Sequence, residues 1–295
     1  MVIIPFFALL LPLGLSFDLP SFLAEWSSPL TDWCVGNVPS GRFQPLYAAL
    51  CCGAALPKSS PQFQLFRHLG LVHLLVVSGL HLLTLEKGIY SVLQKQALFA
   101  RLSPFVLVVF VAVCGFAPPV TRAYFQRLIN LVGAQSSKRW PPSLAVLLTG
   151  CLTLCLLPSW FNSLSLQLSW TAALLLCLRL PLIATSFLIY VGLCPYLLPL
   201  GVAHPVSLLV TGWAGVTVLI PLLACAWGTF LIPPLQPWSD SLCQGLIHLL
   251  EQLQYQLPPP VSRSVNLNHH WLWLYLLALH LGVYFWEVRQ RRKLL

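Results

Sequence analysis

The sequence predicts an all-α fold: a polytopic bundle of about seven to eight transmembrane helices with one amphipathic helix at the membrane interface. Composition carries this prediction. Hydrophobic residues make up 58% of the 295 residues and charged residues only 8%, and the mean hydropathy is +0.81. A water-soluble fold of this size could not cover its surface with so few charges, and a disordered chain would be far more polar.

The charges that remain are mostly basic. There are 16 Lys plus Arg against 7 Asp plus Glu, which gives a net charge of +9. Two explanations are open at this point. Cytoplasmic loops of membrane proteins collect Lys and Arg, and proteins that handle an anion such as nucleic acid are also basic.

Most of the ten cysteines lie inside apolar runs, where they behave as small hydrophobic residues. Cys34, Cys51 and Cys52 differ, because they lie near the first extramembrane stretch. We expect a disulfide among them if this stretch faces an oxidising compartment.

Uncharged apolar runs, taken in order, give the predicted organisation. Residues 1–17 form an N-terminal span, and residues 18–66, with early acids, Pro and Trp, form a short extramembrane or interfacial stretch. Residues 67–288 form the transmembrane core, and residues 289–295 form a basic tail. Within the core the apolar runs cover residues 68–85, 103–121, 140–178, 180–239 and 264–286. Prolines divide the longer runs, with a turn expected at Pro158–Ser163.

One segment of the core has a different pattern. Between residues 240 and 257, apolar residues recur every three or four positions, with Gln and Glu between them. This pattern predicts an amphipathic helix lying on the membrane surface. The positive-inside rule puts the basic tail in the cytoplasm, and the early acids put residues 18–66 outside.

Polar side chains at membrane depth are candidates for function because they are costly there. At about 100° per residue, His73, Ser78 and His81 share one side of a helix, and Gly79 permits a close helix approach. A buried polar network that fixes helix packing is the plain alternative. A zinc site lacks a third ligand, and a hydrolase lacks an acid because Glu86 lies beyond the predicted span. We therefore expect no catalytic residue, metal or cofactor.

Two more polar sets follow. Arg122 and Arg127 come directly after a pair of prolines and belong either to an interfacial basic helix or to an anion contact. Gln167 and Ser169 alternate with leucines at the start of a span. There they would bond across helices or line a hydrated path.

These sets form motifs in a fixed order. The first contains an arginine, a Gly-Leu-x-His and a Ser-Gly-Leu-His: Arg67, Gly70, His73, Ser78, Gly79 and His81. Later elements lie at residues 121–123, 165–169 and 204–209. The motifs and their order resemble those of the ComEC family of bacterial competence proteins, over about residues 45–290.

The resemblance implies an inner-membrane channel that carries single-stranded DNA into the cytoplasm during natural transformation. Arg67, Arg122 and Arg127 would attract the phosphate backbone. The path would be lined or shaped by His73, Ser78, Gly79, His81, Gln167 and Ser169. The expected partners are single-stranded DNA, membrane lipid, an extracytoplasmic DNA receptor, cytoplasmic single-strand DNA-binding proteins and further copies of the chain.

Family members usually carry an OB-like domain and a metallo-β-lactamase-like domain as well. Neither is found in this sequence, so we expect the membrane core alone, without enzymatic activity. We also expect the acids to lie at span ends or in loops, because an acidic lining would repel a polyanion. The alternative function is a transporter of a small anion or lipid-linked precursor that uses the same polar residues, and a structural scaffold comes third.

Overall fold

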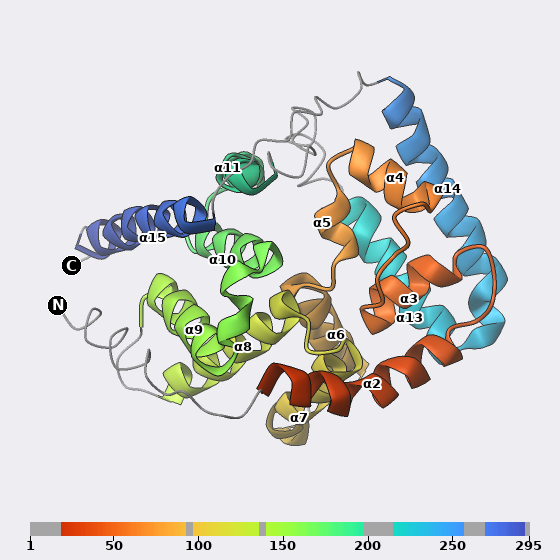
Figure 1. Ribbon diagram of the computed structural model, residues 1–295, viewed down its shortest axis with the longest axis horizontal. Coiled ribbons are helices and arrows are strands. Elements are labelled where there is room, and N and C mark those ends of the chain that lie inside the picture. The colour runs from red at the N-terminus through yellow and green to blue at the C-terminus, as the bar shows by residue number, and fades with distance from the viewer. Residues whose placement is uncertain (1–18, 93–96, 136–139, 198–214, 257–268, 293–295) are drawn as a thin grey trace.

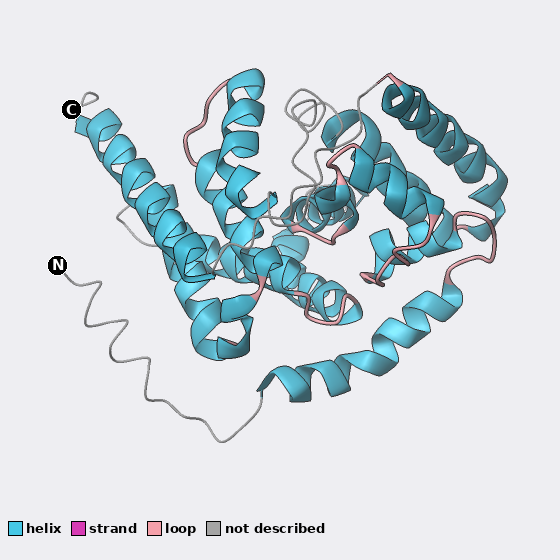
Figure 2. Cartoon of the chain, turned by 45° about the horizontal axis from the view of Figure 1, so that its top comes forward, coloured by secondary structure: helices cyan, strands magenta, loops and turns pink. Residues whose placement is uncertain are grey.

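The fold is all-helical wherever the structure, a computed structural model, describes the chain (Figure 2). It describes residues 19–92, 97–135, 140–197, 215–256 and 269–292. The predicted span at 1–17 and the motif at 204–209 lie outside these residues. The all-α prediction is therefore confirmed for the described part of the chain.

Each predicted apolar run contains at least one helix in its described part (Figure 1). The first half of the chain contains α2 (Leu19–Asn37), α3 (Gln44–Cys52), α4 (Pro61–His68), α5 (Val72–Leu75), α6 (Gly79–Val92), α7 (Ala97–Val113) and α8 (Pro118–Gln135). The second half contains α9 (Pro142–Leu156), α10 (Leu164–Leu176), α11 (Leu182–Leu197), α13 (Ile220–Leu231), α14 (Gln236–Tyr255) and α15 (His269–Arg292). In Figure 1, α8, α9, α10 and α15 gather on one side, and α3, α4, α13 and α14 gather on the other.

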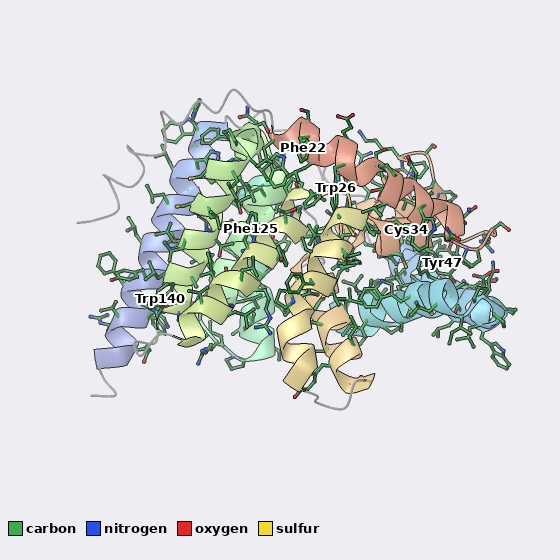
Figure 3. The ribbon with its side chains drawn as sticks, turned by 90° about the horizontal axis from the view of Figure 1, so that it is seen from below. Phe22, Trp26, Cys34, Tyr47, Phe125 and Trp140 are labelled. Carbon is green, nitrogen blue, oxygen red and sulfur yellow. A yellow bond between two sulfur atoms is a disulfide. The ribbon has the colours of Figure 1, made fainter. Side chains whose placement is uncertain are left out.

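One helix in the described residues, His270–Gln290 within α15, is both long and apolar enough to cross a membrane. The other apolar helices are shorter, with 10–17 residues each: Ser103–Val113, Pro142–Leu156, Leu164–Leu176, Ile183–Leu197 and Thr217–Leu231. Figure 3 shows α15, α9 and α8 side by side. The bundle of seven to eight spans remains a prediction.

The long run at 140–178 divides as predicted. The 3-10 helix Pro158–Asn162 separates α9 from α10. Ser163 then caps α10, its hydroxyl accepting a hydrogen bond from the Leu166 N–H at 3.3 Å.

The predicted continuous span over residues 68–85 is wrong. It consists of the end of α4, the short α5 and the start of α6, with extended backbone at Val76 (ψ 126°). Gly70, with φ of 70°, turns the chain after α4. His73 and His81 therefore belong to different helices, and the shared helix face predicted for them does not exist.

Residues 19–66, the described part of the predicted extramembrane stretch, are mostly helical. Cys34 of α2 forms a disulfide with Cys52 of α3, while Cys51 remains a buried free thiol. One apolar core contains residues from α2, α3, α13 and α14. Figure 3 shows Cys34 on the same side of the molecule as Tyr47, far from Trp140 at the other end.

The predicted amphipathic helix is α14, which packs on α3, α4 and α13. Its buried positions are Ser239, Cys243, Ile247 and Leu250, whereas Leu242 and Leu249 are exposed. The Tyr47 hydroxyl of α3 donates a hydrogen bond to Asp240 Oδ1 at 2.8 Å. Burial raises the pKa of Tyr47, so this hydroxyl stays protonated and the link between α3 and α14 persists.

Candidate functional site

A cavity of about 550 Å³ lies between α6, α8 and α10, with further lining from α5 and α11. The lining is apolar apart from a small number of polar groups. Six of the nine predicted site residues line it: His73, Ser78, Gly79, Arg122, Arg127 and Ser169. The sequence motifs thus converge on one cavity, although they lie on different helices.

Ser78 and His81 are joined by hydrogen bonds at the start of α6. The Ser78 backbone N–H donates to His81 Nδ1 at 3.2 Å, and the Ser78 Oγ accepts from the Leu80 N–H at 3.3 Å. This arrangement resembles a capping box, with His81 in the position that Glu or Gln usually takes. It differs in that the Ser78 hydroxyl accepts from the second residue of the helix, Leu80, and not from the third. His81 is 0% exposed. His81 therefore shapes the start of α6 beside the cavity, but it does not line the cavity.

His73 lies on α5 and lines the cavity. Its Nδ1 is 3.2 Å from the carbonyl oxygen of Gly70, so Nδ1–H is the donor in this contact. In a neutral imidazole this leaves Nε2 as an acceptor.

Gly79 brings α6 close to α8. A Cβ at this position would lie 3.2 Å from the Cβ of Ala123, which is tight for two side chains. The predicted close approach at Gly79 is confirmed, and it joins the first motif to the second.

Arg122 presents a buried guanidinium to the cavity. The residue is 4% exposed, and its Nε donates to Ser169 Oγ at 3.0 Å, which joins α8 to α10. Its buried Nη1 has no hydrogen-bond partner among the described residues. A buried cation with a free donor is costly unless an anion or water meets it. The cavity is therefore suited to an anionic group.

Arg127 lies one and a half turns further along α8 and is ion-paired. Its Nη2 is 2.7 Å from Glu86 Oε1, and its Nε donates to the same oxygen at 2.8 Å. Glu86 lines the cavity, so the prediction that every acid lies at a span end or in a loop is wrong. The reason is the break before Gly79, which makes Glu86 a mid-helix residue of α6 facing α8.

Arg67 and Gln167 do not join the cavity. Arg67 is exposed on the last turn of α4. Gln167 is 0% exposed, and its Nε2 donates to the Phe161 carbonyl at 3.5 Å. Gln167 therefore ties α10 to the preceding 3-10 helix.

Arg179 lines the cavity and was not among the predicted residues. The available signal was its isolation, because it is the one charged residue in the sequence between Arg139 and Asp240. Sequence reasoning treats such a charge as the boundary of a span. A charge alone in a long apolar run is equally a candidate for function.

The cavity provides cations and hydrogen-bond donors. Within the described residues, no group of three or more His, Cys, Asp or Glu side chains is placed to hold a metal ion.

A family model described as "Competence protein" matches residues 50–292. Neither the curated proteins nor the solved structures give a match to the chain.

Proposed function

Because this chain belongs to the competence protein family, we propose that it is an inner-membrane channel that carries single-stranded DNA into the cytoplasm during transformation. The family links the chain to DNA uptake and to the membrane, and α15 is long and apolar enough to span one. The strand would come from an extracytoplasmic receptor and pass to single-strand DNA-binding proteins. The observation that carries this proposal is the buried, partly unsatisfied guanidinium of Arg122 in a cavity lined by five other motif residues.

Chemical reasoning supports a strand of DNA as the ligand. Each nucleotide brings one phosphate, whose oxygens accept charge-assisted hydrogen bonds from arginine. The apolar remainder of the lining suits bases and sugars, which lack charge. The one acid of the lining, Glu86, is ion-paired to Arg127 and so repels the strand weakly.

The size of the cavity favours a second candidate function. A volume of about 550 Å³ is typical of a site for one small molecule. The same guanidinium would then bind a small anion or the phosphate of a lipid-linked precursor during transport. The test of this second function is to measure transport of the small anion or lipid-linked precursor in the Arg122→Ala and His73→Ala variants.

The test is DNA translocation in a transformable deletion strain complemented with this reading frame. We expect Arg122→Ala and His73→Ala to abolish transformation while the protein stays at normal level in the membrane. Labelled DNA should accumulate in a nuclease-resistant form outside the inner membrane, because the block lies at translocation and not at binding.

Lys58→Ala is the control, since Lys58 is an exposed cation that does not line the cavity. It should transform at the wild-type frequency. Arg122→Lys, which keeps the charge but loses the planar donor geometry, should recover part of the activity. Wild-type transformation by Arg122→Ala would overturn the proposal.

A further inference from the structure

Arg179 has an unusual backbone for an arginine. Its φ is 52°, in the left-handed region that glycine usually occupies after a helix. The turn follows α10 and precedes Pro181, so a glycine would serve the backbone better at this position. A charged side chain held there despite the steric cost indicates that its position matters.

Arg179 lines the same cavity as Arg122, and it is exposed whereas Arg122 is buried. Cys177, at the end of α10, lines the cavity and interacts electrostatically with both guanidiniums. Arg122 is held on the α8 side by Ser169, and Arg179 approaches from the turn after α10. Two cations from different elements therefore flank one half-exposed thiol.

Neither guanidinium makes an ion pair with a carboxylate of the described residues, in contrast to Arg127 with Glu86. Of the three charges that act on Cys177, the Glu287 carboxylate has the largest effect, and it accepts hydrogen bonds from the Ser143 N–H and Oγ at the start of α9. Glu287 offsets part of the positive charge beside Cys177, but two like charges without a direct ion pair still repel each other. An anionic ligand between them would relieve the repulsion.

We propose that Arg122 and Arg179 form a phosphodiester-binding subsite of the cavity, with Cys177 at its base. The proposal deepens the proposed function and rests on it for the identity of the ligand, a phosphate of single-stranded DNA. Arg127, about 7.5 Å from Arg122 along α8, is ion-paired to Glu86 and lies outside this subsite.

The thiol of Cys177 gives a direct probe. Purified protein in detergent is labelled with a sulfonate-bearing or a trimethylammonium-bearing methanethiosulfonate, and modification is mapped by mass spectrometry. The anionic preference is the labelling rate with the sulfonate reagent divided by the rate with the trimethylammonium reagent. Two nearby cations should make this ratio about tenfold higher at Cys177 than at Cys155. Cys155 is a suitable internal reference because it is half-exposed on α9 and does not line the cavity.

Substitution separates the subsite from general charge. Arg179→Gln should reduce the anionic preference at Cys177 severalfold, and Arg179→Lys should retain it. Lys58→Gln removes one exposed cation that does not line the cavity and should leave the preference unchanged. Equal preference in wild type and Arg179→Gln would overturn the subsite.

Ligand protection identifies the source of the phosphodiester. Oligothymidylate should slow labelling of Cys177, and the protection should need Arg179. Protection by phosphatidylglycerol nanodiscs and not by oligothymidylate would overturn the assignment to DNA.

The two proposals fail in different ways. Charge-selective labelling that depends on Arg179, together with wild-type transformation by Arg122→Ala, would leave an anion subsite in a protein that does not translocate DNA. The opposite result is loss of transformation in Arg122→Ala together with the same labelling preference at Cys177 in wild type and Arg179→Gln. It would reject the subsite but keep the proposed channel.

Discussion

Ser78 and His81 form a hydrogen-bonded pair at the start of a helix, and this explains why the two residue types occur three positions apart. The serine satisfies a backbone donor of the first turn, and the histidine returns a bond to the serine N–H. A histidine in this role is neutral, because its Nδ1 must accept. Its expected contribution is to fix where α6 begins beside the cavity.

Ser78→Ala should therefore destabilise the protein by about 1 kcal/mol, the usual value of a helix cap. The measurement is the melting temperature of the purified protein in detergent. Ser78→Asn should restore most of the loss, since Asn is also a good cap. Ser91→Ala, at an exposed serine of the same helix, is the control. An equal loss in both variants would contradict the capping role.

Glu86→Gln should strengthen anion binding, because it removes the charge that neutralises Arg127 while keeping the side chain's size. We expect the affinity for a labelled oligothymidylate, measured by fluorescence anisotropy at fixed salt, to rise by about threefold to tenfold. Glu251→Gln is the matched control, as Glu251 is exposed on α14. Unchanged or weaker binding in Glu86→Gln would argue against an anion site at Arg127.

At the scale of helices, hydropathy predicts the elements that depend on apolar length and on breakers. The boundary between α9 and α10 follows from an uncharged run interrupted by Pro158. The break between α4 and α6 was not predicted, because leucines and valines continue through it. It depends on Gly70 and on the Ser78 cap, which are features of backbone hydrogen bonding that a hydropathy average cannot detect.

The contact between α9 and α10 depends on one glycine. A Cβ at Gly150 would overlap three ring atoms of Trp170. The ring has little freedom to move, because its other neighbour is Trp273 at a centroid distance of 5.7 Å. Gly150→Ala should lower stability by about 1–3 kcal/mol through overpacking, as read from the melting temperature.

Gly282→Ala on α15 is the control for this prediction, since a Cβ there meets nothing within 4 Å. It should be neutral or slightly stabilising, because alanine favours helix more than glycine. A similar loss at both positions would show that the effect is not one of packing.

At the scale of the whole molecule, the contacts join segments far apart in the sequence. Tyr47 bonds to Asp240, and Arg122 bonds to Ser169. The sequence motifs supplied six of the residues that line the cavity. They did not predict the partners of these residues, because one sequence holds no information on pairing across helices. Arg179 was missed for a related reason, since a lone charge is equally consistent with a loop.

The Cys34–Cys52 disulfide fastens α2 to the core through α3. Replacing both cysteines with serine should destabilise the protein by about 3 kcal/mol for a loop of this length. The melting temperature should fall, and a reductant should lower that of the wild type but not of the variant. Cys155→Ser removes a half-exposed free thiol and should have little effect. Equal melting temperatures in wild type and double variant would refute a structural role for the bond.

The contrast between paired and unpaired arginines has an energetic consequence for a protein in a polarised bilayer. The Glu86–Arg127 pair carries no net charge, so it can move along the membrane normal without electrical work. Arg122 and Arg179 lack such a counterion among the described carboxylates. Moving one elementary charge across the full membrane field changes the electrical free energy by about 2.3 kcal/mol per 100 mV. In the proposed inner-membrane channel, a rearrangement that moves these two side chains along the membrane normal would therefore respond to the transmembrane voltage.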